Sequence, residues 1–276
     1  MRIQIALLAC IVAFLFSCQK EKDSVGGGGG GANSSRLTKM VLKSGSDSSV
    51  EEFTYNGVGK IIAFKWSGVD SGQPIDFRLS YIRNSSGIIQ QQIMKSAELV
   101  AIGIDSIVTF VNYDAGNNRY KGAVSNIVFF GFSIRDSIVF QYDGTGRLVS
   151  EIDYEDAGAG MMPYTKTEYS YSGSNLAGEK YYDYNDVSGT FDLSATNIYE
   201  YDSKINPLQF VADAPVLNMN PFYSSNNITK TTYVDATDPT NNYVSTDTYT
   251  YDSSNRPASS VSVTGTNTTT TTFYYQ

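Results

Sequence analysis

Apolar and polar side chains alternate along short stretches of this chain, and each stretch ends in a cluster of Asp, Asn, Ser and Gly residues. The segment FQYDGTGRLVSEIDY, residues 140–154, shows this pattern clearly. Its aromatic residues before the turn share one face of a strand, because strand side chains alternate between the two faces. Asp143 then supplies a local hydrogen bond, and Gly144 and Gly146 tolerate the positive φ angles of a tight turn. The segment predicts a β-hairpin.

The same unit recurs along the chain. The residue before each turn is Tyr55, Arg83, Tyr113, Tyr142, Tyr171, Tyr201, Tyr223 or Tyr251, with spacings of 28, 30, 29, 29, 30, 22 and 28 residues. A fixed period of this length indicates one supersecondary unit copied along the chain. Each unit reads as a strand, a short turn, a second strand and a looser return. The repeat predicts an all-β antiparallel meander of about 14 to 16 long strands.

Three segments refine this prediction. Residues 206–227 contain three of the seven prolines and alternate poorly, so we expect an irregular excursion there. The threonine-rich tail, residues 261–276, reads as a closing strand. The most apolar stretch, residues 127–140, predicts central strands with a turn marked by Gly131 and by Asp136 with Ser137.

The composition of the chain limits its domain number, its partners and the kinds of catalytic and metal site that it can contain. At 276 residues, an all-β chain can form one domain. The net charge is −8, and no cluster of Lys and Arg is visible, so we expect no nucleic-acid partner. The chain has no histidine, which excludes Ser-His-Asp and Cys-His nucleophile pairs and His-ligated metal sites. Its two cysteines, Cys10 and Cys18, both lie near the N-terminus, so no disulfide can connect the strands.

The N-terminus predicts a membrane anchor. Residues 1–17 carry a positive charge near their start, at Arg2, and continue with an apolar run typical of a signal peptide. The run ends in Leu-Phe-Ser-Cys, which resembles a bacterial lipobox, and this resemblance implies that Cys18 is lipidated. The alternative is an ordinary signal peptide that leaves Cys18 unmodified. Residues 18–35 then predict a flexible tether that includes six consecutive glycines, and residues 36–276 a single β domain. Gln19 resembles the residue that directs such lipoproteins to the outer membrane, either to its periplasmic face or to the cell surface.

The repeated Tyr-Asp-x-x-Gly/Asn-Arg unit resembles the YD repeat. Together with the lipobox and the glycine tether, residues 201–208 (YDSKINPL) and 226–231 (NNITKT) resemble a family of bacterial lipoproteins of unknown function described as having a porin-like fold. This resemblance covers essentially the whole chain after the tether. It implies a closed or nearly closed barrel and no known activity. We expect this barrel to be water-soluble rather than membrane-spanning, because strands such as TKTEYSYS lack the outward apolar band that lipid requires. A twisted open sheet and a β-sandwich are the alternatives.

Candidate binding residues are mainly aromatic. Trp66, Tyr181, Tyr182 and Tyr184 could stack on sugar rings, although aromatic residues on one face also serve as cross-strand pairs. We expect no cofactor and no metal. Asp183, Asp186 and Asp192 could offer oxygen ligands to calcium, but their spacing does not match an EF-hand loop, which favours a solvated loop.

A carboxylate series offers the one candidate for catalysis. Glu151, Asp153 and Glu155 lie on one face of a strand, about 7 Å apart between neighbours, and their spacing is similar to that used by inverting glycosidases. Working carboxylates also need opposed geometry and one buried member with a raised pKa. We therefore expect this face to be polar and solvated, and we predict no catalytic residue.

Two functions from different classes remain. The first is a non-enzymatic, lipid-anchored binding or scaffold module, monomeric, with a glycan or another envelope protein as its partner. The second is a carbohydrate-active hydrolase or lyase that uses Tyr and Asp or Glu, which requires two carboxylates on separate strands of a deep cleft. A barrel of about 16 strands also leaves a wide lumen, which inward loops such as residues 206–227 could fill.

Overall fold

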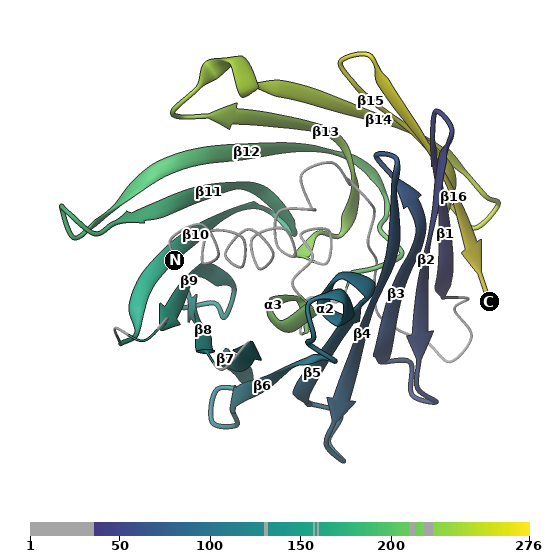
Figure 1. Ribbon diagram of the computed structural model, residues 1–276. Coiled ribbons are helices and arrows are strands. Elements are labelled where there is room, and N and C mark those ends of the chain that lie inside the picture. Colours follow the sequence, from purple (N-terminus) through teal and green to yellow (C-terminus); the bar gives the residue numbers. More distant parts are fainter. Residues whose placement is uncertain (1–35, 130–131, 157, 159, 210–212, 218–222) are drawn as a thin grey trace.

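The structure is a computed structural model that describes residues 36–129, 132–156, 158, 160–209, 213–217 and 223–276. The predicted signal peptide, Cys18 and the tether lie outside these residues. The described chain is almost entirely β-strand (Figure 1). Its strands are β1 (Leu37–Ser44), β2 (Asp47–Tyr55), β3 (Ile61–Asp70), β4 (Gln73–Arg83), β5 (Ile89–Ser96), β6 (Ile107–Asp114), β7 (Arg119–Phe129), β8 (Phe132–Tyr142), β9 (Leu148–Asp156), β10 (Met162–Ser172), β11 (Asn175–Asn185), β12 (Thr190–Ile205), β13 (Asn226–Asp235), β14 (Tyr243–Tyr251), β15 (Pro257–Thr264) and β16 (Asn267–Tyr275).

The strands form a closed antiparallel barrel. Each strand pairs with the next strand along the chain, and β1 pairs with β16 to complete the ring. The closing register places Met40 opposite Phe273, and both side chains are buried. The predicted meander and the closed barrel are confirmed, whereas the open sheet and the sandwich are not formed. The predicted closing strand is present as well, although residues 261–264 belong to β15.

One rim of the barrel carries the repeated turns, and we call it the turn rim. In the turn between β8 and β9, Asp143 Oδ1 accepts hydrogen bonds from the backbone nitrogens of Thr145, at 2.8 Å, and Arg147, at 3.0 Å. Gly146 has a φ of 86°, as the sequence predicts. The side chains of Asn56, Asn84 and Asp252 bind their own turns in the same way. The side-chain cap is therefore the physical basis of the repeat in these four turns.

The tyrosines of the repeat are structural. Tyr55 and Tyr201, and likewise Tyr275 of the last strand, each donate a hydrogen bond to a backbone carbonyl on a neighbouring strand, at 2.6 to 2.8 Å. A cation from the preceding turn often covers the ring, as Arg119 covers Tyr142 at 4.7 Å and Arg147 covers Tyr171 at 5.2 Å. Tyr223 differs, because it lies before β13 rather than before a hairpin turn, so its assignment to the repeat is wrong.

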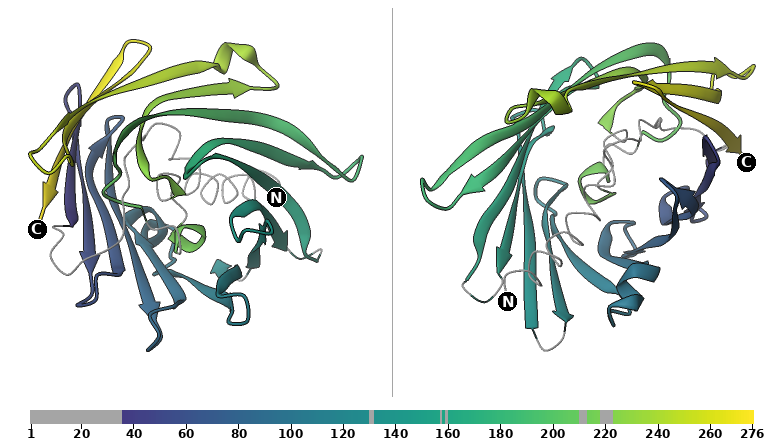
Figure 2. Two further views of the ribbon diagram at one scale, coloured as in Figure 1. Left: turned by 180° about the vertical axis from the view of Figure 1, so that it is seen from behind. Right: turned by 45° about the horizontal axis from the view of Figure 1, so that its top comes forward.

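The main hydrophobic core lies inside the turn rim. The irregular excursion after β12 is confirmed, and it enters the ring of strands there with the short helix α3 (Ala214–Leu217) (Figures 1 and 2). Leu208, Val216 and Leu217 of this excursion are buried against strand residues such as Tyr81 and Phe140. We call the described residues 206–209, 213–217 and 223–225 the plug. An inward loop thus fills part of the wide lumen at this end.

The opposite rim is built differently. The helix α2 (Ala97–Ala101) connects β5 to β6 there, and Leu99 packs in a small separate core with Ile107 and Ile127.

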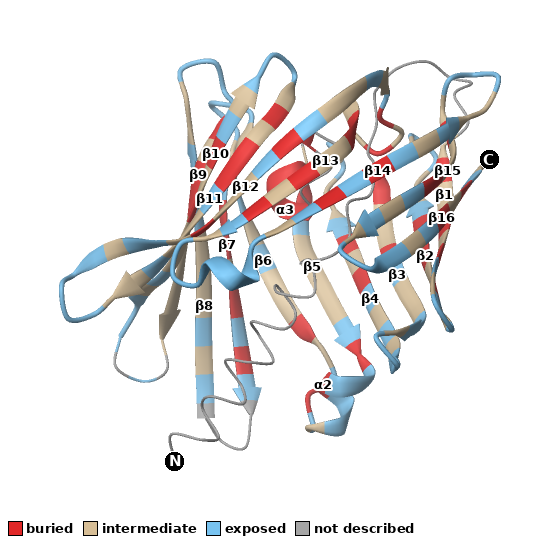
Figure 3. Ribbon diagram, turned by 90° about the horizontal axis from the view of Figure 1, so that it is seen from above, coloured by how far each residue is buried: buried red, intermediate tan, exposed pale blue. Residues whose placement is uncertain are grey.

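Along the strands, buried and exposed residues alternate (Figure 3). Asp136 and Ser137 lie in the middle of β8, so the turn predicted at these two residues is wrong, and Gly131, the other residue of that prediction, lies outside the described residues. None of the helices in the described residues is long and apolar enough to cross a membrane.

Candidate functional site

The inner wall of the barrel carries buried carboxyl groups on β9. Glu151 lies opposite the buried Phe140 of β8, and Asp153 lies opposite Ile138, so the acidic face of β9 points inward. Only 8% of Glu151 is exposed. The expectation of a solvated acidic face is therefore wrong for Glu151. Alternation alone cannot distinguish the inner from the outer face, because both faces of this strand mix apolar and polar residues.

Burial changes the protonation of these carboxyls. It raises the pKa of Glu151 to about 8, and the nearby Asp153 carboxylate adds to the shift, while a hydrogen bond from Tyr169 opposes it. Burial also raises the pKa of Asp153 to about 6, against a hydrogen bond from Thr165. Asp136 on β8 lies directly opposite Glu155 and has a pKa raised to about 6, mainly by burial. At neutral pH, Glu151 is therefore mostly protonated and uncharged.

A second buried carboxyl lies two strands further along the wall. Glu179 of β11 is 2% exposed, and its Oε2 accepts hydrogen bonds from the hydroxyls of Tyr181 and Tyr199, both at 2.5 Å. Asn197 donates to the Tyr181 hydroxyl at 3.1 Å. Tyr169 of β10 lies opposite Glu179 and also bonds Glu151, so it connects the two carboxyls. This arrangement fixes phenol, amide and carboxyl groups on one inner surface.

Asp213 attaches the plug to the barrel wall by polar contacts. Asp213, just before α3, accepts a hydrogen bond from the Tyr120 hydroxyl on β7 at 2.8 Å. Its other oxygen lies 3.0 Å from the guanidinium of Arg83 at the end of β4, whose side chain is 4% exposed. The Tyr120 hydroxyl in turn accepts from the backbone nitrogen of Ile89 at 3.1 Å. These contacts join the plug to β4, β5 and β7.

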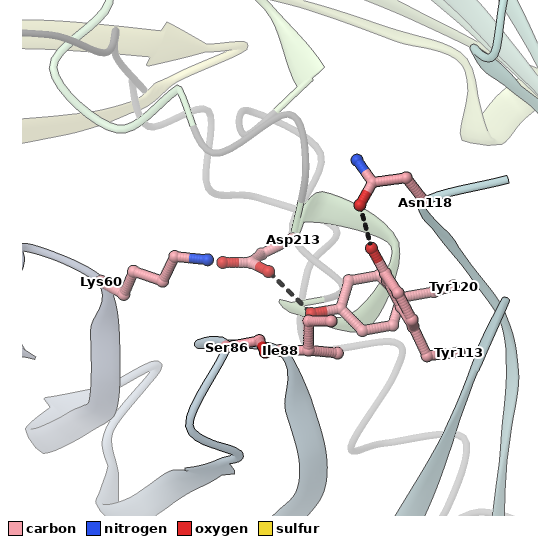
Figure 4. Close-up of a pocket in the computed structure, with 7 residues that line it drawn as sticks. All are labelled: Lys60, Ser86, Ile88, Tyr113, Asn118, Tyr120 and Asp213. Atoms are coloured by element: carbon pink, nitrogen blue, oxygen red, sulfur yellow. Dashed lines mark hydrogen bonds between the residues drawn. The ribbon is translucent and has the colours of Figure 1, made fainter. Parts of the chain in front are cut away.

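A pocket of about 230 Å³ lies between the plug and the turn rim (Figure 4). The rings of Tyr113 and Tyr120 form one side, 5.2 Å apart and edge to face. The Tyr113 hydroxyl donates to Asn118 Oδ1 at 2.6 Å. The side chains that line it come from four separate segments of the chain: Lys60, Ser86, Ile88, Tyr113, Asn118, Tyr120 and Asp213.

The predicted aromatic platform is divided between different surfaces. Trp66 lies on the inner wall, between Glu51 and Phe77 on the adjacent strands. Tyr181 also faces inward, but β11 lies half-way round the barrel from β3. Tyr182 and Tyr184 lie on the outer wall.

Their outer contacts are with neighbouring side chains. The Tyr182 hydroxyl donates to Glu168 at 2.7 Å, and Lys166 covers its ring. The Tyr184 ring packs against Phe191 at 5.3 Å. Only Trp66 and Tyr181 of the four predicted residues therefore line the lumen.

The three aspartates considered for calcium lie near the turn between β11 and β12. Asp183 and Asp192 are cross-strand partners, and Asp192 accepts a hydrogen bond from Asn185 at 2.8 Å. Asp186 lies in the turn itself. In the part of the chain that the structure describes, no group of three His, Cys, Asp or Glu side chains is arranged to hold a metal ion.

Three important residues of these sites were not among the sequence candidates. Glu179 and Asp213 are isolated acids in the sequence, and Tyr120 looks like one more strand tyrosine. Tyr120 and Asp213 are separated by 93 residues, and Glu179 accepts a hydrogen bond from Tyr199, 20 residues away on the next strand. The one available signal is the position of Glu179, which follows the small and apolar residues 176–178 and lies two residues before Tyr181, since a buried acid there needs partners.

Comparison with known proteins shows the fold. No protein-family model matches the sequence, and no curated protein matches it. A porin-like protein from Bacteroides uniformis has a similar structure, with a TM-score of 0.53 and 13% sequence identity, over 87% of this chain and 98% of that chain. A porin-like protein from Bacteroides vulgatus is similar to the same degree, with a TM-score of 0.54 and 13% identity, over 88% of this chain and 99% of that chain. The chain thus has the architecture of porin-like proteins.

Proposed function

We propose that this protein is a non-enzymatic glycan-binding module held at the outer membrane by a lipid on Cys18. The observation that carries the proposal is the inner wall around Glu179, where phenol and carboxyl groups are fixed by hydrogen bonds in a partly filled lumen. Sugars present hydroxyl groups and apolar ring faces, which suit such a wall. The porin-like architecture of two structures from Bacteroides is compatible with an envelope location.

Isothermal titration against neutral and acidic oligosaccharides tests the binding function. We expect saturable heat with at least one glycan class, and we expect Tyr181→Ala to weaken it because the variant removes an inward ring. Tyr182→Ala is the matched control, because Tyr182 lies on the outer wall. No heat with any glycan would refute glycan binding, and capture of another envelope protein instead would support the scaffold function.

The lipid anchor can be tested separately. We expect mass spectrometry of the membrane-extracted chain to find acyl groups on a mature N-terminal Cys18. The Cys18→Ser chain should then appear in the soluble fraction. An unmodified Cys18 in the wild-type protein would leave the barrel without this anchor and would refute this part of the proposal.

One observation favours a second function, a glycoside hydrolase or lyase. Glu151 and Glu179 lie on separate strands of the inner wall, and Glu151 is protonated at neutral pH, as a general acid must be. On our proposal, aryl glycosides and polysaccharides are not turned over. Turnover that disappears in Glu151→Gln but persists in Glu155→Gln would establish the enzyme instead.

A further inference from the structure

We propose that the pocket between the plug and the turn rim binds an acidic sugar residue of a glycan, with the Lys60 ammonium binding the sugar carboxylate. This inference rests on the proposed glycan-binding function and specifies the class of sugar. It concerns the pocket in Figure 4, which is separate from the carboxyl wall around Glu179.

Lys60 has no aspartate partner in its own turn, whereas the basic residues at the same position of two other turns do. Arg147 and Arg256 occupy the same turn position, four residues after Asp143 and Asp252, and each pairs with that aspartate. In the turn of Lys60 the capping residue is Asn56, which makes the same backbone hydrogen bonds without a charge. Among the described residues, Lys60 forms no ion pair. The turn therefore presents an uncompensated cation in a chain of net charge −8.

The neighbouring turn adds no net negative charge to the pocket. Its capping residue is also an asparagine, Asn84, and Arg83 precedes it. Asp213 pairs with Arg83 at 3.0 Å and accepts the Tyr120 hydroxyl, so its charge is already compensated. The pocket therefore has one net positive charge, contributed by Lys60. Charge-assisted hydrogen bonds to a carboxylate are roughly twice as strong as neutral ones.

The position of the Lys60 ammonium is fixed by its surroundings. Nζ donates to the carbonyl oxygen of Gly87 at 3.1 Å. A Cβ added at Gly87 would lie only 3.2 Å from Cδ, Cε and Nζ of Lys60, so the stem packs closely on this glycine. An ammonium has three donors, which leaves two N–H groups for a ligand. Figure 4 shows the side chain extending toward Asp213 across the pocket.

The remaining walls suit a sugar ring better than a small inorganic anion. Tyr113 and Tyr120 offer aromatic surface on one side, which can pack against the apolar face of a sugar. Ser86 and the amide of Asn118 supply polar groups for sugar hydroxyls, and both residues are exposed at the mouth. A volume of about 230 Å³ admits one small polar molecule. A longer glycan chain could leave the pocket on this exposed side.

Isothermal titration at low salt with a galacturonic acid trimer, and with a neutral galactose trimer of the same linkage, tests the inference. We expect the acidic trimer to bind at least about tenfold more tightly. Lys60→Gln should remove this preference without weakening the neutral trimer, and Lys60→Arg should restore most of it. Lys65→Gln is the matched control, since Lys65 is exposed on the outer wall of β3. Thermal unfolding of each variant confirms that the barrel is intact.

The outcomes separate this inference from the proposed function. Equal binding of both trimers, or a preference for the acidic trimer that Lys60→Gln leaves unchanged, would overturn the pocket assignment and keep the glycan-binding function. Absence of binding by every glycan would overturn both. Tighter binding of the acidic trimer that depends on Lys60 and not on Lys65 supports the assignment.

Discussion

At the scale of single residues, the most unusual feature is the set of carboxyl groups on the inner wall. Glu151 is buried and lies near Asp153, so its ionised form is disfavoured both by desolvation and by a neighbouring negative charge. Its pKa of about 8 lies above the ordinary value of 4.5, and the folded chain therefore keeps a proton that the unfolded chain releases. The stability that depends on this proton is fully present below about pH 4.5 and is lost as the pH rises through about 8.

We predict that the barrel becomes less stable on the alkaline side of neutrality. The free energy of unfolding should fall on the order of 3 kcal/mol between about pH 5 and about pH 9, as Glu151, Asp153 and Asp136 lose their protons. Glu151→Gln should remove much of this slope. Denaturant unfolding at several pH values measures it, and Glu52→Gln on the outer face of β2 serves as control. A wild-type stability that rises over this range would contradict the prediction.

The turn caps give a second prediction at this scale. Asn84 Oδ1 accepts the backbone nitrogens of Ser86 and Ile88, each at 3.0 Å. Asn84→Ala removes both hydrogen bonds and should lower the free energy of unfolding by about 1 to 2 kcal/mol. Asn84→Asp keeps an acceptor oxygen, as in the turn of Asp143, and should keep most of the stability. Equal losses in the two variants would show that the cap does not stabilise the turn.

At the scale of elements, the plug is the part that departs from the regular meander. Its residues are buried beside strand residues from several sides of the barrel, so it contributes core that a barrel of sixteen strands otherwise lacks. The contact of Asp213 with Arg83 and Tyr120 fixes the position of α3 against the wall. The plug therefore contributes both to the stability of the barrel and to the shape of the pocket beside it.

Removing the acid of this contact should be costly. Asp213→Ala leaves the guanidinium of Arg83, 4% exposed, without its carboxylate, and should destabilise the fold by about 3 kcal/mol or more. The double variant Arg83→Met with Asp213→Ala should recover part of this loss, because no buried charge remains. Asp76→Ala, an exposed site on β4, controls for loss of an acid. Additive effects in a double-mutant cycle would show that the pair is not coupled.

At the scale of the whole molecule, closure of the ring removes every free sheet edge between the described strands. The seam between β1 and β16 has continuous register from Lys39 with Tyr274 to Ser44 with Thr269. Open edges favour pairing with other chains, so this seam protects the folded chain from aggregation. This protection is complete only after β16 has formed and has paired with β1.

A crosslink can test the seam directly. Val41 and Thr272 are Cα partners, so Val41→Cys with Thr272→Cys should form a disulfide within one chain and stabilise it by about 2 to 4 kcal/mol. A chain that begins after Cys18 avoids competing thiols. Val41→Cys with Thr270→Cys is the control, because Thr270 pairs with Lys43 instead. Non-reducing mass analysis distinguishes the outcomes, and crosslinks only between chains would contradict closure.

The sequence predicts the periodic parts of this molecule well, because each hairpin carries its own turn chemistry. The turns around Asp143 and Asp252 form as their residues indicate. The buried wall and the pocket could not be predicted, because Tyr120 and Asp213 are partners 93 residues apart and because nothing in the sequence indicates that Glu179 lies on the buried side of β11. The prediction that the acidic face of β9 is solvated failed for Glu151 for a related reason. Nothing in the sequence of that strand indicates which of its two faces points into the barrel.

The meeting of the two ends of the domain has one more consequence. The backbone nitrogen of Arg36 donates to the carbonyl oxygen of Gln276 at 2.8 Å, and the nitrogen of Gln276 donates back to Arg36 at 3.0 Å. A short peptide could join these ends, and new termini could then be cut at another turn of the circle. The ring of strands has no required starting point, so a circular permutant that begins at any of its hairpin turns should keep the same strand pairing.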